Sequence, residues 1–182
     1  MKRFARPALA TLVFSTLAVG FWLSPVRSEE KPSAEIKLVP IKFNDYLDKI
    51  AADKKAKLTV VDAWATWCGP CKENFPHVVE MHKKYAGKGL KVISLSLDDP
   101  EKPKKVAEAA AFLKTQGAVF TNLLLDETPD DAFEKLKINA IPAVFLFGPD
   151  GKEIKRFTLD DPKNQFTYDD VEKVIREHLG LK

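Results

Sequence analysis

The sequence predicts an α/β domain with a central mixed, mostly parallel sheet flanked by helices. Short apolar segments typical of buried strands alternate with longer segments of helical apolar spacing along most of the chain. This is the pattern of a parallel sheet with helical crossovers. Near the C-terminus, two strand-like segments flank Pro149-Asp150-Gly151, which predicts a hairpin and therefore an antiparallel edge. The 182 residues are 45% hydrophobic and 30% charged, which suits one globular domain and a further segment.

The first three elements along the chain are a helix, a strand and a helix. Residues 43–54 are expected to form a short helix, because apolar residues such as Tyr46 and Ile50 recur on one side. Residues 58–65 are apolar at nearly every position, which predicts a strand buried on both faces. Residues 69–85 follow as a helix with apolar residues at helical spacing.

The middle of the chain contributes two strands separated by a helix. Residues 90–97 predict the second strand. Residues 102–116 carry apolar side chains at helical spacing, and Gly117 is expected to end this helix. Residues 119–125 predict the third strand.

The C-terminal part adds two helices and the hairpin. Residues 129–136 are expected to form a short helix with proline at its start. Residues 143–147 and 152–157 predict the two hairpin strands. Residues 168–179 predict a last helix, with Thr167 as its N-cap.

The basic residues that raise the net charge are concentrated at the N-terminus. The whole chain has a formal charge of +3 and a sequence pI of about 8.7. Residues 1–28 contain no acidic residue and four basic ones, Lys2, Arg3, Arg6 and Arg27. Without them the charge falls from +3 to −1, so the rest of the chain has no basic excess for nucleic acid. We expect no nucleic-acid partner.

The same N-terminal segment has the layout of an export signal. A basic head is followed by an apolar core over residues 8–23, then by Ser24-Pro25, with cleavage expected after Ser28. An uncleaved anchor is the alternative, because the uncharged stretch is close to the roughly 20 residues that a spanning helix needs. Both interpretations place the remaining chain outside the cytoplasm, in the periplasm or cell envelope. The cleaved, soluble form is the one we expect.

The exported part divides into a linker and one domain. Residues 29–40 are polar and contain proline and serine, which predicts a linker. Residues 41–182 then form a single domain, without internal repeats, that we expect to be a monomer.

Both cysteines of the chain lie in one Cys68-Gly69-Pro70-Cys71 motif, between a predicted buried strand and a predicted helix. At a helix N-terminus, free backbone N–H groups and the helix dipole stabilise a negatively charged sulfur on Cys68. The thiolate is the form that attacks a disulfide. Cys71 follows one helical turn later on the same face, so it can attack the mixed disulfide on Cys68 and release the reduced substrate. Pro70 suits a first helical turn, and Gly69 leaves the approach to Cys68 open.

Two other interpretations of the cysteine pair are weaker. A zinc site needs about four ligands, and the chain offers only three histidines besides the two cysteines, with no evident cluster. A structural disulfide that closes so short a loop would constrain the unfolded chain very little.

The motif and several separate residues resemble the thioredoxin family. The segment 61–72, VDAWATWCGPCK, is similar to the thioredoxin active-site segment. Asp62 matches the buried acid of the family, Trp67 matches the tryptophan before the first cysteine, and Pro76 matches the proline of the active-site helix. Ile141-Pro142 matches the cis-proline segment. The similarity runs from about residue 58 to the C-terminus and implies a thioredoxin-like fold.

This resemblance implies roles for residues around the cysteines. Asp62 would have a raised pKa within its apolar strand and would exchange a proton with Cys71. The alternative is that Asp62 points to a polar edge and pairs with a lysine. Trp67 would line the substrate surface, with core packing as the alternative. A substrate backbone would pair with Ile141, because Pro142 has no N–H to donate.

The export signal and the extra helix over 102–116, inserted before the third strand, resemble envelope thiol–disulfide oxidoreductases of the TlpA/ResA type. Such proteins reduce partner proteins, including apocytochromes c. The implied partners are exported proteins with disulfides and a membrane electron donor, and the chemistry needs no cofactor. One position departs from the group: Asn74 stands where its members often carry glutamate, with Glu73 beside it. This difference weakens the case for a cytochrome c role more than the case for redox chemistry.

Three other functions remain open from the sequence. The protein could donate its disulfide instead of reducing one, although Gly69-Pro70 and Asp62 match reducing thioredoxins. A peroxidase of the peroxiredoxin kind would need proline and threonine placed ahead of a lone cysteine, and Thr66 does not fit that spacing. A copper carrier would use the two thiols together with a histidine, usually with three residues between the cysteines.

Overall fold

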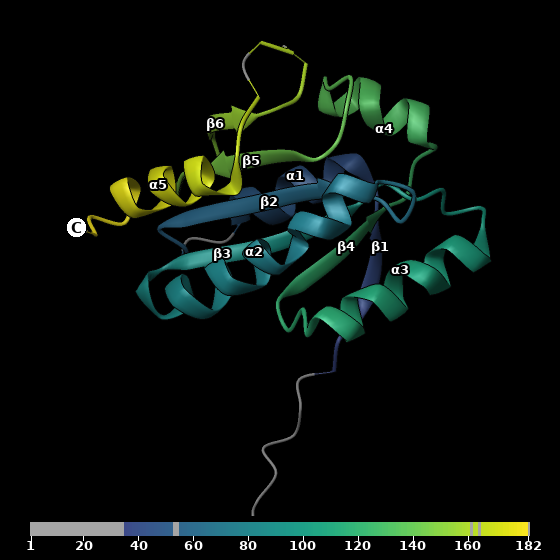
Figure 1. Cartoon of the computed structure of the whole chain (residues 1–182), viewed down its shortest axis with the longest axis horizontal. Helices are drawn as coiled ribbons and strands as arrows, with labels where there is room; N and C mark the ends of the chain where they lie inside the picture. Colours follow the sequence, from purple (N-terminus) through teal and green to yellow (C-terminus); the bar gives the residue numbers. More distant parts are fainter. Residues whose placement is uncertain (1–34, 53–54, 161, 164, 182) are drawn as a thin grey trace, which may run out of the picture. The chain divides into compact units, whose positions relative to one another are not determined.

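A six-stranded sheet forms the centre of the described part of the chain (Figure 1). The computed structural model describes residues 35–52, 55–160, 162–163 and 165–181. In spatial order the strands are β1 (Leu38–Ile41), β4 (Thr121–Leu125), β3 (Leu90–Ser96), β2 (Leu58–Trp64), β5 (Ala143–Phe147) and β6 (Glu153–Phe157). The pairs β1–β4, β4–β3 and β3–β2 are parallel, whereas β2–β5 and β5–β6 are antiparallel. The predicted mixed, mostly parallel sheet with an antiparallel hairpin edge is confirmed.

Strand β1 corrects one boundary of the sequence analysis. Residues 29–40 were expected to form a linker, but β1 begins at Leu38 and pairs in parallel with β4 along its whole length. The strand is short and contains Pro40, and both features weaken the strand pattern in a sequence. The predicted export signal over 1–28 lies outside the described residues. Among the residues that are described, no helix is long and apolar enough to cross a membrane.

Helices cover both faces of the sheet. They are α1 (Phe43–Ala52), α2 (Gly69–Tyr85), α3 (Pro103–Gln116), α4 (Pro129–Leu136) and α5 (Tyr168–His178), with a short 3₁₀ turn over Ala86–Lys88. Gly117 ends α3 in the left-handed conformation, as expected from its position. Thr167 caps α5 through a reciprocal capping box with Asp170. The helix α3 is the predicted insertion before the strand over 121–125, which is the fourth strand in chain order because β1 precedes it.

Buried side chains of the strands and helices form two hydrophobic clusters around the sheet. The larger cluster contains Val61 and Ala63 of β2 together with residues of α1, α2, α3 and α4. The other contains Leu58 and Val60 of β2 together with residues of α2 and α5. In Figure 1, α2 and α3 lie in front of the sheet and α1 behind it. Asp62 has the same parity as Val60, so its side chain enters the face that α2 and α5 cover.

The two edges of the sheet differ from its centre. Every residue of the central strand β2 is buried. Edge strand β1 has four residues, one of them proline, and its two middle residues are exposed. Edge strand β6 has the sequence Glu-Ile-Lys-Arg-Phe, and its first four residues are exposed. Short, proline-containing or charged strands are the usual edges of natural sheets.

Candidate active site

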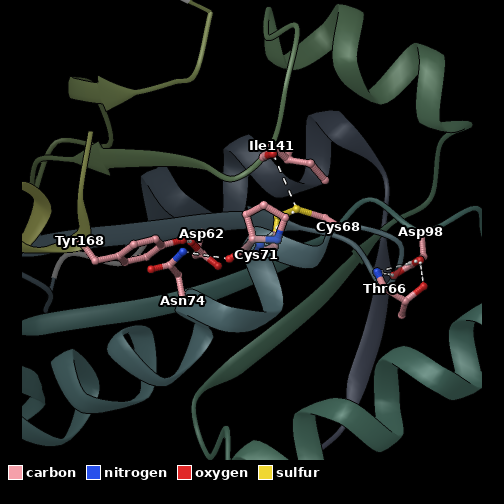
Figure 2. The surroundings of a disulfide bond; sticks show 9 residues. Asp62, Thr66, Cys68, Cys71, Asn74, Asp98, Ile141 and Tyr168 are labelled. Carbon is pink, nitrogen blue, oxygen red and sulfur yellow. Dashed lines mark hydrogen bonds between the residues drawn. A yellow bond between two sulfur atoms is a disulfide. The ribbon is translucent and has the colours of Figure 1, made fainter. Parts of the chain in front are cut away.

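The two cysteines form a disulfide at the junction of β2 and α2 (Figure 2). Cys68 is the N-cap of α2, and its Sγ accepts a hydrogen bond from the backbone N–H of Cys71 at 3.2 Å. The Cα atoms of the two residues are 5.3 Å apart. When the disulfide is reduced, this N–H and the N-terminus of α2 remain in place to stabilise a negative charge on the Cys68 sulfur.

The two sulfur-bearing residues differ in accessibility. Cys68 is 6% exposed to solvent, whereas Cys71 is fully buried. Gly69 and Pro70 beside Cys68 are exposed, and a Cβ at Gly69 would meet no atom within 4 Å. An incoming disulfide can therefore approach Cys68 and cannot approach Cys71. The Cys68 sulfur can therefore attack an incoming disulfide, whereas the buried Cys71 sulfur can react only with Cys68.

Ile141 and Pro142 face the disulfide from the loop before β5. The peptide bond between them is cis, as the resemblance implied. The carbonyl oxygen of Ile141 lies 3.6 Å from the Cys68 Sγ. A disulfide sulfur carries no hydrogen, so this is a contact in the oxidised protein that can become a hydrogen bond once Cys68 carries a thiol. The loop is thus placed where a substrate bound at Cys68 would meet it.

The two tryptophans of the motif have different surroundings. Trp67 is 53% exposed and stacks on Phe133 of α4, with the ring centroids 6.3 Å apart. Trp64 is fully buried and packs against Phe75 and Phe112. Core packing therefore describes Trp64 and not Trp67, which presents an aromatic surface next to Cys68.

Asp62 is buried on the inner side of the cysteine pair. Its Oδ1 accepts a hydrogen bond from the Tyr168 hydroxyl at 2.5 Å, and its Oδ2 is buried without a hydrogen-bond partner. Burial raises the pKa of the Asp62 carboxyl to about 7, and the hydrogen bond from Tyr168 lowers this pKa in part. The alternative of an edge position paired with a lysine is wrong, because Asp62 is fully buried and its partner is a tyrosine.

A second buried carboxylate fixes the loop that precedes the cysteines. Asp98 accepts hydrogen bonds from the backbone N–H of Thr66 through both oxygens, at 3.1 and 3.0 Å, and from the Thr66 hydroxyl at 2.5 Å. It also accepts a hydrogen bond from the Ser96 hydroxyl at 2.9 Å. Asp98 directly follows the strand predicted over residues 90–97, and the sequence pattern alone does not mark it as a site residue. The signal was available, because neighbouring parallel strands end at the same edge of a sheet and β3 ends beside β2.

The remaining polar residues near the motif do not reach the sulfurs. The Nδ2 of Asn74 donates to the carbonyl oxygen of Pro70 at 2.9 Å, within α2. Lys72 and Glu73 are exposed on the same helix. His82 packs against Phe120, with ring centroids 5.2 Å apart. In the described residues, no group of three or more His, Cys, Asp or Glu side chains could hold a metal ion.

Comparison with known proteins agrees with this geometry. A family model described as the AhpC/TSA family matches residues 35–156, well over half of the sequence. The chain belongs to this family. The sequence is 28% identical over 107 residues to the thiol-disulfide oxidoreductase ResA of Bacillus subtilis, a match that covers 59% of this chain and 56% of that protein. It is 22% identical over 144 residues to the sporulation thiol-disulfide oxidoreductase A of the same species, covering 79% of this chain and 85% of that protein.

Solved structures show the same fold. A Chlorobium tepidum protein described as the thiol:disulfide interchange protein DsbE aligns with a TM-score of 0.56 and 28% identity, covering 70% of this chain and 84% of that one. The thioredoxin-like fold is thereby confirmed. The matched segments span 56% and 61% of the length of two ResA relatives, from Bacillus subtilis and Bacillus cereus.

Proposed function

We propose that this chain is an exported thiol–disulfide oxidoreductase that reduces disulfides in other proteins through Cys68 and Cys71. One observation carries the proposal: the two cysteines form a disulfide at the N-terminus of α2 with only Cys68 at the surface. The family match and the names of the relatives support the same class of chemistry. Export is supported by the composition of residues 1–28.

The proposed reaction transfers two electrons in two steps. The Cys68 thiolate attacks one sulfur of the substrate disulfide, forms a mixed disulfide and expels the other substrate sulfur as a thiolate. Cys71 then loses its proton and attacks the Cys68 sulfur, which closes the Cys68–Cys71 disulfide and releases the second substrate thiolate. The substrate gains two electrons and the cysteine pair loses two. A dithiol reductant, which we propose to be a membrane electron donor, must then reopen the pair.

The residues around the pair would serve binding and proton transfer. Trp67 and the Ile141–Pro142 loop would receive an extended substrate segment, with its backbone paired to Ile141. Asp62 would accept the Cys71 proton. The proposed substrates are exported proteins with disulfides in general. A specialised role in cytochrome c maturation has less support, because Asn74 is bonded to Pro70 and offers no carboxylate at its position.

Cysteine substitutions test the proposal directly. Reduced wild-type protein, Cys68→Ser and Cys71→Ser are each mixed with a disulfide-bonded protein, and the appearance of free substrate thiols is followed. We expect Cys68→Ser to lose at least about 1000-fold in rate, because it lacks the attacking thiolate. We expect Cys71→Ser to accumulate a stable mixed disulfide on Cys68, visible as a covalent adduct by mass spectrometry. A wild-type rate for Cys68→Ser would contradict the proposal.

The direction of electron flow is tested with the oxidised and reduced forms of the wild-type protein. If the protein is a disulfide donor, its oxidised form should oxidise a reduced substrate faster than its reduced form opens an oxidised one. We expect the opposite order.

A further inference from the structure

The buried tyrosine on α5 donates a hydrogen bond to the proposed proton acceptor, Asp62. The Tyr168 hydroxyl lies 106 residues from Asp62 in sequence and donates to its Oδ1 at 2.5 Å. In Figure 2 the Asp62 carboxyl lies between the Tyr168 ring and the Cys68–Cys71 disulfide. The geometry points to Tyr168 as a positioning residue, which occupies one oxygen of Asp62 and leaves the other to take the proton of Cys71. This inference rests on the proposed function, because it assigns a role within the second step of that reaction.

The structure holds the tyrosine hydroxyl in place from several sides. The capping box of Thr167 and Asp170 fixes the first turn of α5, in which Tyr168 is the first residue. The ring of Tyr168 stacks on His77 of α2 and contacts the ring of Phe166, with centroids 5.9 Å away in both cases. Tyr168 itself is 5% exposed. A hydroxyl fixed in this way can hold one carboxylate oxygen in a constant orientation.

The Oδ2 oxygen of Asp62 is available to accept a proton. Oδ2 is buried and has no hydrogen-bond partner, although a buried carboxylate oxygen ordinarily finds one. When the mixed disulfide on Cys68 is resolved, the Cys71 S–H gives its proton to Oδ2, and the electron pair left on sulfur forms the Cys68–Cys71 bond. The substrate sulfur leaves with the electron pair of the bond that breaks. The hydrogen bond from Tyr168 stabilises the charged form of Asp62, so it keeps the acceptor available near neutral pH.

Among the residues that the structure describes, few ionisable groups face Asp62. Tyr168 approaches it from α5 and Cys71 from α2, while His77 of α2 lies against the far side of the tyrosine ring. In the sheet, the residues opposite Asp62 are Ser94 of β3 and Val144 of β5, and neither ionises near neutral pH. Burial raises the pKa of Asp62, and Tyr168 lowers it. Removing the hydroxyl should therefore raise that pKa further.

The experiment uses the reduced full chain and the chromogenic disulfide 5,5′-dithiobis(2-nitrobenzoate). The first nitrothiobenzoate is released when Cys68 attacks the reagent, and the second when Cys71 resolves the mixed disulfide. Stopped-flow absorbance separates the two releases, and each is recorded from pH 5 to pH 9. For Tyr168→Phe we expect an unchanged first release and a second release about tenfold slower at pH 7. The midpoint of the pH profile of the second release should rise by about one to two units, which corresponds to a lost hydrogen bond to a charged group.

Two further variants separate this role from a structural one. Tyr85→Phe is the matched control, because Tyr85 donates to Glu172 of α5 at the same 2.5 Å distance but away from the cysteines. We expect it to leave both releases unchanged. Asp62→Asn should slow the second release, and adding Tyr168→Phe to Asp62→Asn should slow it no further. An equal slowing by Tyr168→Phe with and without Asp62 would overturn the inference.

The outcomes distinguish the inference from the proposed function. If Cys68→Ser still gives the first release at the wild-type rate, the proposed function fails. If both releases require the cysteines and Tyr168→Phe keeps the wild-type pH profile, only the role of Tyr168 is overturned. Should Tyr168→Phe not fold, 3-fluorotyrosine in place of Tyr168 keeps the ring and makes the hydroxyl a stronger donor. It should move the midpoint of the second release to lower pH, and an unmoved midpoint would count against the inference.

Discussion

Asp62 and Asp98 lie at neighbouring parallel strands, and both are fully buried, yet their surroundings are opposite. Asp98 receives hydrogen bonds from the backbone and hydroxyl of Thr66 and from Ser96. Asp62 receives one, from Tyr168, and keeps an oxygen without a partner. A buried carboxylate that accepts several hydrogen bonds ties its donors to one arrangement, whereas burial with a single donor raises the pKa of Asp62 to about 7. The difference suggests that one aspartate maintains the active-site loop and the other is available for proton transfer.

The largest loss of stability is expected at Asp98, the aspartate that accepts several hydrogen bonds. Asp98→Ala leaves the Thr66 N–H, the Thr66 hydroxyl and the Ser96 hydroxyl buried without their acceptor. We expect the free energy of unfolding to fall by about 5 kcal/mol, because each unpaired buried donor costs about 1–3 kcal/mol. Urea unfolding followed by circular dichroism measures this change.

The neighbouring residue offers a control for that measurement. Asp99 pairs at the surface with Lys102 at 2.9 Å, so Asp99→Ala should cause a much smaller change. Equal losses for the two variants would show that the network around Asp98 does not stabilise the loop.

The contribution of Asp62 to the free energy of unfolding is expected to depend on pH. The pKa of Asp62 is about 7 in the folded protein and 3.8 in a model peptide, so the folded state binds more protons between these values. Stability from this group is therefore fully present below about pH 4 and is lost as the pH rises through 7. Asp62→Asn removes this dependence. The stability of the variant relative to wild type should grow by at most about 4 kcal/mol between pH 4 and pH 8.

Urea unfolding of the oxidised proteins at several pH values gives this difference directly. Other titrating groups are common to both proteins and cancel. A stability difference that stays constant from pH 4 to pH 8 would mean that Asp62 titrates normally, and the contrast with Asp98 would lose its basis.

The smallest effect is expected at Tyr85, which donates to the partly exposed Glu172. The hydrogen bond from Tyr85 lowers the pKa of Glu172, which is the reverse of the net shift at Asp62. The stability that this hydrogen bond contributes is present above the pKa of Glu172 in the unfolded chain. It is lost as the pH falls through the lower pKa of Glu172 in the folded protein. Tyr85→Phe should reduce the free energy of unfolding by about 1 kcal/mol at pH 7 and by less at pH 3. A loss that grows toward acid pH would contradict this assignment.

Most of the fold could be predicted from the sequence because proline and glycine residues mark where helices begin and end. Pro129 and Gly117 begin and end helices as expected, and the helix from Gly69 to Tyr85 has the predicted bounds. Strand β1 was missed because four residues that include Pro40 carry almost no strand pattern. Its place is determined by pairing with β4, which is more than 80 residues away.

The candidate site was predictable where local sequence carries the chemistry. Cys68, Cys71 and Asp62 lie within ten residues of one another, and the motif singled them out. Tyr168 and Asp98 were not recognised, because each meets its partner through the arrangement of the sheet and helices. Asp98 could have been inferred once β2 and β3 were assumed to be neighbours. Nothing in the sequence near Tyr168 indicates that the first turn of α5 reaches the middle of β2.

The two edges of the sheet have a consequence for the proposed reduction of disulfides in other proteins. The proposed substrates are proteins that carry disulfides, and wherever such a protein is not fully folded its extended segments can add to open sheet edges. Here one edge is four residues long and contains Pro40, and the other exposes Lys155 and Arg156. Both edges therefore discourage strand addition. The proposed docking of a substrate segment at Ile141 would then face little competition from the sheet edges, and this would favour binding beside Cys68.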